Sequence, residues 1–145
     1  YSIELIDEIN EVIGKRWIKT FLNEEILKYL SEKYNLYVFS NWFYDAPYKR
    51  LETVGYLKYF KEIYTSDRVG SKPYKNSFKT VLNEIGATAD ECIMIGDSLR
   101  SDINGAINAG IKAIWFNQFN KSDEIIKDKS KYYEIENFNQ IKEIL

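Results

Sequence analysis

The sequence of 145 residues contains no histidine, one cysteine, two prolines and one methionine. Without histidine, no imidazole can act as a general base or as a metal ligand, so carboxylates, hydroxyls and lysines must carry any chemistry. A single cysteine excludes an internal disulfide, and we expect a reducing compartment, the cytoplasm. No apolar run reaches the roughly 20 residues that span a bilayer, and no segment resembles a signal peptide.

The charges are nearly balanced, because 20 basic and 22 acidic residues give a net charge of -2. This balance argues against nucleic acid or a membrane surface as a partner. The length suits one domain with a substantial core, and a hydrophobic content of 45% is ordinary for a globular protein. The chain begins at Tyr1 and its only methionine is Met94, so we expect a fragment or a processed product.

Helical patterns alternate with short apolar stretches along the chain. Isoleucines recur at helical spacing over 3–13, which predicts a helix there. Further helical patterns occur at 24–34, 48–54, 73–85, 102–109 and 137–145. Short segments typical of buried strands occur at 36–40, 62–66, 92–95 and 112–116, and the segment 132–135 precedes the last helix. The alternation predicts an α/β fold, a Rossmann-like parallel sheet with helices on both faces.

Polar side chains follow three of the predicted strands. Ser40 and Asn41 come after the first, Lys72 lies in the loop after the second, and Asp97 and Asp102 come after 92–95. Because ligands of open parallel sheets bind outside the carboxyl ends of the strands, we expect these side chains to converge. A hydroxyl, an amide, an ammonium and two carboxylates suit a phosphate beside a divalent cation, and Mg²⁺ prefers one or two carboxylates with water and phosphate.

Each of these residues also has a purely structural interpretation. Ser40 and Asn41 are typical turn residues, Lys72 fits a solvated surface position, and Asp102 fits the N-cap of the helix that follows. Lys72 precedes a helix, however, where a cation is electrostatically unfavourable and a bound anion would explain it. Asp97 follows a buried strand and a glycine, which is harder to explain by structure alone.

Three blocks occur in a fixed order: YVFSN, VGSKPYKNSF and IMIGDSLRSDINGAINAGIKAIWFN. They resemble motifs II, III and IV of the haloacid dehalogenase superfamily, in particular its phosphatase-like members with a helical cap. The resemblance implies that Ser40 and the Asn41 backbone bind a phosphoryl group, and that Lys72 neutralises it and orients the nucleophile. It also implies that Asp97 coordinates Mg²⁺, with Asp102 supporting the metal directly or through other groups.

The first motif of that superfamily, DxDx(T/V), is absent. Its first aspartate attacks phosphorus to form an aspartyl-phosphate, and its second acts as general acid and base. No DxD occurs in the sequence, and Asp7 lies in a helical pattern without a second aspartate. We therefore expect residues 1–22 to be the end of a helical cap, and residues 23–145 to be a core domain without its first strand.

The resemblance implies that the first strand is central, between the strands that end near Ser40 and Asp97, so its absence would leave a gap there. The gap would expose two facing rows of backbone groups, each costing about 1–3 kcal/mol if buried without a partner. We expect the strand to be supplied by residues upstream of Tyr1, by a second chain or by rearranged pairing.

Two functions follow from these observations. The first is the C-terminal part of a Mg²⁺-dependent phosphohydrolase that acts on a small phosphate monoester, with its nucleophile upstream of this chain or absent. On this reading the chain alone is inactive, and Trp42, Phe43 and Tyr44 line the entrance. The alternative is a non-catalytic module that binds phosphate, Mg²⁺ or a protein partner. The missing DxD favours the alternative, whereas the retained residues, namely Ser40, Lys72, Asp97 and Asp102, favour the first.

Overall fold

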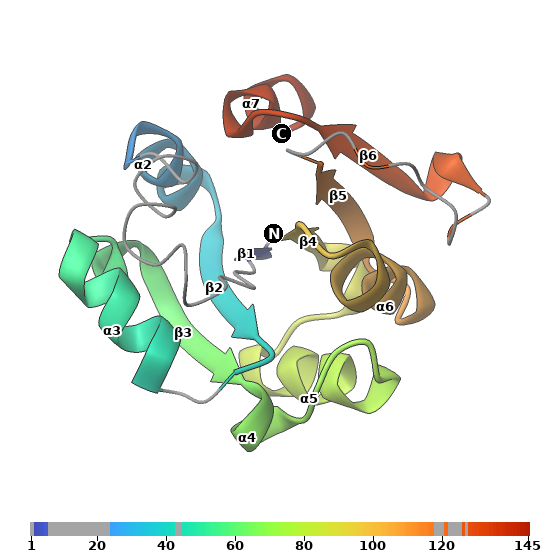
Figure 1. Cartoon of the computed structure of the whole chain (residues 1–145), viewed down its shortest axis with the longest axis horizontal. Helices are drawn as coiled ribbons and strands as arrows, with labels where there is room; N and C mark the ends of the chain where they lie inside the picture. Colours follow the sequence, from blue (N-terminus) through green and yellow to red (C-terminus); the bar gives the residue numbers. More distant parts are fainter. Residues whose placement is uncertain (1, 6–23, 43–44, 118–120, 122–125, 127) are drawn as a thin grey trace.

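The computed structural model describes residues 2–5, 24–42, 45–117, 121, 126 and 128–145. Their strands form one 6-stranded sheet in the order β3-β2-β1-β4-β5-β6, with every neighbouring pair parallel (Figure 1). The strands are β1 Ser2–Leu5, β2 Asn35–Ser40, β3 Phe60–Thr65, β4 Cys92–Gly96, β5 Lys112–Phe116 and β6 Tyr132–Ile135. The predicted α/β fold with a parallel sheet is confirmed.

Helices connect these strands at nearly every position where the sequence predicts them. The α-helices are α2 Glu24–Lys33, α3 Asp45–Val54, α4 Ser66–Val69, α5 Lys75–Ile85, α6 Asn104–Asn108 and α7 Ile141–Ile144. Shorter helical turns are η1 Leu57–Tyr59, η2 Ala89–Glu91, η3 Leu99–Ile103, η4 Lys129–Lys131 and η5 Phe138–Gln140. The short helix α4 was not predicted. In the part of the chain that the structure describes, no helix has the length and apolar character needed to cross a bilayer.

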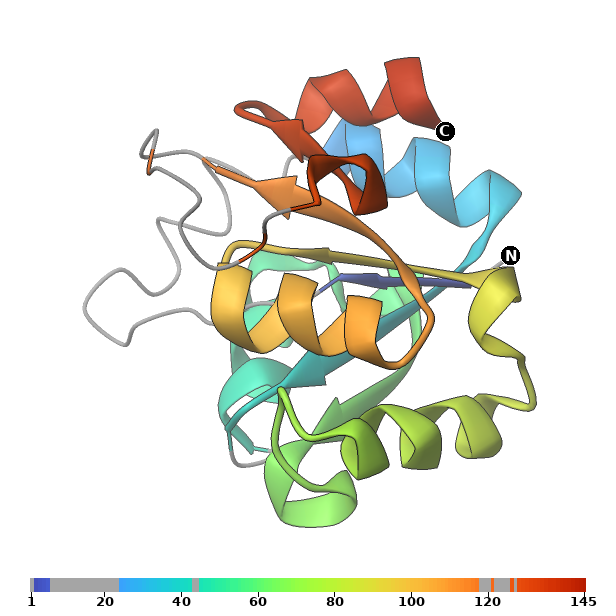
Figure 2. The same cartoon turned by 90° about the vertical axis from the view of Figure 1, so that its right-hand side faces the viewer.

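The helices cover both faces of the sheet. Helices α2, α3 and α7 pack on one face, together with the side chains of Val38, Ile95 and Ile114. Helices α5 and α6 pack on the other, together with Met94 and Trp115. Neighbouring strand residues therefore point to opposite faces, as the pleat of a strand requires. Figure 2 shows this layering, with α2 and α7 above the sheet and α5 below it.

Residues 2–5 form the strand β1, so the helix predicted over 3–13 is wrong at these positions. β1 pairs with β2 on one side and with β4 on the other, and Leu5 lies opposite both Val38 and Ile95. Isoleucine spacing is a local signal worth under about 1 kcal/mol per residue. Pairing the facing edges of two buried strands is worth more, because each unpaired backbone group costs about 1–3 kcal/mol. The remaining part of the predicted helix, with Asp7, lies outside the described residues.

The sheet consequently has no gap between β2 and β4. The predicted core domain without its first strand is contradicted at this point, because the chain's own residues 2–5 occupy the central position. Residues 2–5 of the chain itself supply this strand, a source that was not among the three we expected. Residues 6–22 of the predicted cap remnant lie outside the described residues, so the boundary after residue 22 stays a prediction.

Candidate functional site

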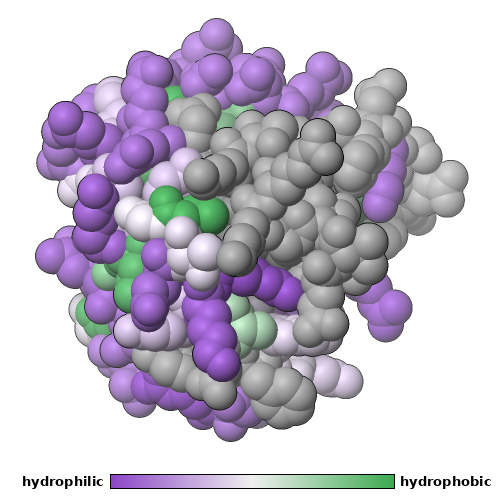
Figure 3. All heavy atoms as spheres, turned by 60° about the vertical axis from the view of Figure 1, so that its left-hand side comes forward, coloured by the Kyte–Doolittle hydropathy of each residue, from purple (hydrophilic) through white to green (hydrophobic). Residues whose placement is uncertain are grey.

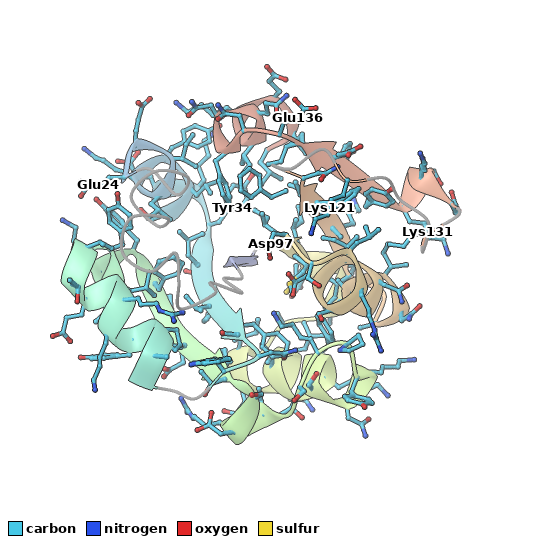
Figure 4. All side chains as sticks on the ribbon, viewed as in Figure 1. Glu24, Tyr34, Asp97, Lys121, Lys131 and Glu136 are labelled. Atoms are coloured by element: carbon cyan, nitrogen blue, oxygen red, sulfur yellow. The ribbon has the colours of Figure 1, made fainter. Side chains whose placement is uncertain are left out.

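The candidate site residues lie at the carboxyl edge of the three central strands. Leu5 of β1 is level with Val38 of β2 and Ile95 of β4, so Ser40 and Asp97 each come two residues beyond the same level. Neighbouring strands lie about 4.8 Å apart, which puts β2 and β4 about 10 Å apart across β1. Ser40 and Asp97 therefore flank the end of β1, as the order of motifs predicted. Figure 4 shows Asp97 in the middle of the molecule, near β1.

Lys72 is a fully buried charged group at this edge. Its side chain has 0% solvent exposure. Its ammonium Nζ donates to the Phe39 carbonyl oxygen at 2.9 Å and to Asp102 Oδ1 at 2.7 Å. It also lies 5.1 Å from the centroid of the Phe39 ring. The solvated-surface interpretation of Lys72 is wrong, because an ammonium remains this buried only when its partners compensate the lost hydration.

Asn41 ties the end of β2 to the loop that carries Lys72. Its Nδ2 donates to the Lys72 carbonyl oxygen at 2.9 Å, and its Oδ1 accepts from the Lys72 backbone N–H at 2.7 Å. The amide side chain thus pairs with both the backbone N–H and the backbone carbonyl of Lys72, 31 residues away. This pair of bonds is more than local turn chemistry, because it fixes where the lysine loop sits against the sheet.

Asp102 is buried beneath the end of β4. It has 0% exposure, and its two oxygens accept from Lys72 Nζ and from the Ser98 backbone N–H, the latter at 3.1 Å. Gly96 makes this approach feasible, since a Cβ at that position would lie 2.3 Å from Asp102 Oδ2. Asp102 is not the N-cap of α6, whose cap position is held by Ile103. Its contacts make it the counter-ion of Lys72.

Asp97 leaves β4 at the level of Ser40 and is only partly buried. Trp115, buried in β5, donates from its indole Nε1 to the Asp97 carbonyl oxygen at 3.1 Å. A neighbouring strand therefore fixes the backbone that presents this carboxylate. The hydrogen bond of Trp115 to Asp97 is a contact that spacing along the sequence does not reveal.

The comparison with known proteins agrees with this arrangement. A family model for haloacid dehalogenase-like hydrolases matches residues 4–116. The chain belongs to this family. The resemblance found from motifs II to IV is thereby confirmed, and the haloacid dehalogenase motifs lie where the polar residues gather.

Three relatives illustrate the range of similar proteins. The putative HAD-hydrolase YfnB of Bacillus subtilis is 34% identical over 83% of this chain and 52% of that protein. Its magnesium-bound crystal structure has a TM-score of 0.76 at 33% identity, covering 83% of this chain and 53% of that one. A glyceraldehyde 3-phosphate phosphatase of Methanothermobacter thermautotrophicus is 34% identical over 79% of this chain and 53% of the relative. The pyrimidine 5'-nucleotidase PynA of Streptococcus pneumoniae is 34% identical over 64% of this chain and 40% of the relative. The chain therefore spans about half the length of the curated relatives it matches, or less.

The acidic residues fit a magnesium ion with few protein ligands. Mg²⁺ is commonly held by one or two carboxylates, with water and phosphate completing its shell. Asp97 is the carboxylate at this edge that is not committed to Lys72. Asp102 uses both oxygens within the protein, which suits the supporting role rather than direct coordination. Among the described residues, no group of three or more acidic or cysteine side chains is placed to hold a metal.

Thr65 was not predicted as part of this edge. It ends β3 directly opposite Ser40 of β2, and it has 0% exposure. Its hydroxyl Oγ1 has no hydrogen-bond partner among the described residues. The only sequence signal was its position at the end of a strand, one residue before the segment that forms α4.

Proposed function

We propose that the chain is the C-terminal part of a Mg²⁺-dependent phosphohydrolase that acts on small phosphate monoesters. The observation that carries the proposal is the buried Lys72 ammonium, which is held between Phe39 and Asp102 beside the ends of β2 and β4. An ammonium has three N–H donors, and these two bonds account for two of them. The third is available to an oxygen of a phosphoryl group. The relatives support the class, since their names denote a phosphatase and a nucleotidase.

The formal charges at this edge favour a divalent cation together with the phosphate. Lys72 contributes +1, whereas Asp97 and Asp102 contribute -1 each, so the three groups carry a net charge of -1. A phosphate dianion alone would be repelled by that negative charge. A bound Mg²⁺ would neutralise the phosphoryl oxygens as a Lewis acid. Asp97 would hold the ion, and the magnesium in the YfnB structure is in keeping with this assignment.

The remaining residues bind and orient the phosphoryl group. The Ser40 hydroxyl and the Asn41 backbone N–H would donate to its oxygens from the end of β2. Lys72 would donate its third N–H, and Asp102 keeps that ammonium charged and fixed in direction. Such preorganised donors stabilise charge that develops on the oxygens during phosphoryl transfer.

The proposal leaves the nucleophile of the aspartyl-phosphate outside the described residues. The sequence has no DxD, so we expect the chain alone to bind phosphate without hydrolysing its esters. This absence is also the observation that favours the second candidate, a non-catalytic module that binds phosphate, Mg²⁺ or a protein. The balanced charge favours a small-molecule ligand over nucleic acid or a membrane, and the buried position of the only cysteine, Cys92, is in keeping with a cytoplasmic location.

The test is calorimetric titration of the chain with inorganic phosphate, with and without Mg²⁺. We expect phosphate binding that requires Mg²⁺ and that weakens at least tenfold in Asp97→Asn, because the amide removes the anionic ligand. Asp90→Asn is the matched control, since that aspartate is exposed and bonds Thr88 away from this edge. Equal affinity in wild type and Asp97→Asn would overturn the metal assignment. Hydrolysis of p-nitrophenyl phosphate by the chain alone would show that the nucleophile lies within it.

A further inference from the structure

We propose that Trp42 and Tyr74 form an aromatic rim that binds the flat, aromatic part of the phosphate ester. The favoured substrates are then monoesters that carry an aromatic ring, such as a nucleobase or a phenyl group. This inference rests on the proposed function, since the rim acts on an ester whose phosphate is held by Lys72. The names of the relatives leave this choice open, because they include both an aliphatic phosphate and a pyrimidine nucleotide.

The exposure of these rings is unusual in this protein. Only three large hydrophobic side chains of the described residues are exposed, namely Trp42 at 43%, Tyr74 at 72% and Tyr133 at 57%. Figure 3, which brings forward the left-hand side of Figure 1, shows that the described part of this face is mostly hydrophilic, with small hydrophobic patches. Two of the three lie close in sequence to residues of the candidate phosphate site, because Trp42 directly follows Asn41 and Tyr74 comes two residues after Lys72. Exposed aromatic side chains that gather at a polar site are a signature of ligand contact rather than of packing.

The two aromatic residues are brought together by the bonds that join β2 to the lysine loop. Trp42 follows Asn41, and Tyr74 comes two residues after Lys72. Because Asn41 and Lys72 are joined by two hydrogen bonds, both ring-bearing residues start near that junction. Along the chain, their Cα atoms lie within about 4 Å and about 7 Å of those of Asn41 and Lys72.

The backbones of both residues are fixed, whereas their rings point to solvent. The carbonyl oxygen of Trp42 accepts from Ser66 Oγ at 3.3 Å. The carbonyl oxygen of Tyr74 accepts from Ser77 Oγ at 2.6 Å, and its N–H donates to Ser71 O at 3.2 Å. A fixed backbone with a solvent-facing ring is the arrangement of a preorganised contact, because little ordering remains when a ligand stacks on it.

An aromatic ring is the chemical group that such a rim recognises best. Indole and phenol rings stack on flat π-systems, and stacking tolerates different rings because it needs no fixed pattern of donors. An aliphatic ester such as glycerol phosphate offers no flat face, so it gains only the contacts of its phosphate. The rim therefore selects a class of esters without selecting one base.

The test compares phenyl phosphate with glycerol phosphate, both titrated into the chain with Mg²⁺. We expect phenyl phosphate to bind about tenfold more tightly, the size of a single stacking contact. Trp42→Ala and Tyr74→Ala should each reduce this preference severalfold while leaving the affinity for glycerol phosphate unchanged. Trp42→Phe, which keeps an aromatic ring, should retain most of the preference for phenyl phosphate. Tyr133→Ala is the matched control, because the exposure of Tyr133 lies between those of Trp42 and Tyr74 but Tyr133 lies on the edge strand β6.

The outcomes separate this inference from the proposed function. If wild type binds neither ester, the proposed function fails and the rim fails with it. If it binds both esters equally, or if the alanine variants keep the preference, the rim is wrong while the phosphate site stands. A second pair, cytidine monophosphate against ribose 5-phosphate, decides whether a nucleobase is accepted as well as a phenyl ring.

Discussion

The Lys72 ammonium and the Asp102 carboxylate form an ion pair of 2.7 Å, and neither side chain is exposed to solvent. Thirty residues separate the two along the chain. The pair joins the loop before α5 to η3, directly beneath the ends of β2 and β4. Loss of one partner leaves the other charge buried without compensation, which is more costly than the absence of both.

The first prediction concerns this pair. Lys72→Met should lower the free energy of unfolding by about 3–5 kcal/mol, because the Asp102 carboxylate stays buried and loses its counter-charge. The double variant Lys72→Met/Asp102→Leu should be less destabilised than the sum of the single variants, since neither charge remains. Urea denaturation followed by circular dichroism measures all three. Additive losses would mean that the two groups do not interact.

The second prediction concerns Gly96, which the Asp102 side chain contacts. In Gly96→Ala the new Cβ would lie 2.3 Å from Asp102 Oδ2 and 2.6 Å from its Cγ, so the carboxylate must move and its bonds to Lys72 and Ser98 must lengthen. We expect a loss of about 1–3 kcal/mol in stability, the usual cost of overpacking, together with weaker phosphate binding.

Gly86→Ala is the control for this substitution. Gly86 has a φ of +70° at the end of α5, and a Cβ there meets nothing within 4 Å. Gly86→Ala should lower the free energy of unfolding by about 1–2 kcal/mol, because a residue with a Cβ is strained in the left-handed conformation. It should leave phosphate binding intact. If both variants change phosphate affinity equally, the specific role of Gly96 is refuted.

Most of the sheet was predictable because its signals are local. The segment 92–95 is apolar, is bounded by polar residues and forms β4 with one further residue. The helix predicted over 73–85 ends at the predicted residue, and Gly86 follows it in the left-handed conformation. The strand β1 was not predictable, since its four residues carry a helical spacing and become a strand through pairing with β2 and β4.

The site could be predicted as a set of residues but not as a set of contacts. Motif order placed Ser40, Lys72 and Asp97 at one edge of the sheet, because parallel strands share that edge. The bonds of Lys72 to Phe39 and Asp102 depend on the packing of loops, which no periodicity encodes. The two hydrogen bonds between Asn41 and Lys72 also depend on the packing of loops and could not be predicted.

The third prediction concerns the buried hydroxyl of Thr65. Thr65→Val removes an oxygen that has no hydrogen-bond partner among the described residues, while keeping the shape of the side chain. The free energy of unfolding should stay unchanged or rise by up to about 1 kcal/mol, because an unsatisfied buried polar group opposes folding. The midpoint of urea denaturation measures the change.

Thr88→Val provides the contrast for Thr65. Thr88 caps η2 through a capping box, and its hydroxyl donates to Asp90 Oδ1 at 2.6 Å. Thr88→Val should therefore lower the free energy of unfolding by about 0.5–2 kcal/mol. A loss of that size in Thr65→Val would show that its hydroxyl has a partner in the folded protein.

The fourth prediction concerns pH and the hydrogen bond from the Tyr59 hydroxyl to Glu24 Oε1, 2.7 Å long. This bond raises the pKa of Tyr59 to about 12 and, from the other side, lowers the pKa of Glu24 below its usual 4.5. Tyr59 has the higher pKa in the folded state, so its stabilising contribution is complete below pH 10 and is lost as pH rises through about 12. Glu24 has the lower pKa when folded, so its contribution is complete above pH 4.5 and is lost as pH falls through the folded value.

Glu24→Gln isolates this bond, because it removes the negative charge but keeps an acceptor. We expect the pKa of Tyr59 to fall from about 12 toward the ordinary value of 10, as followed by NMR of ring-labelled tyrosine with Tyr59→Phe to assign the signal. Glu25→Gln should leave that pKa in place, since Glu25 pairs with Lys142 instead. An unchanged Tyr59 titration in Glu24→Gln would mean that the carboxylate does not hold the phenol proton, and that the bond contributes nothing to stability at either end of the pH range.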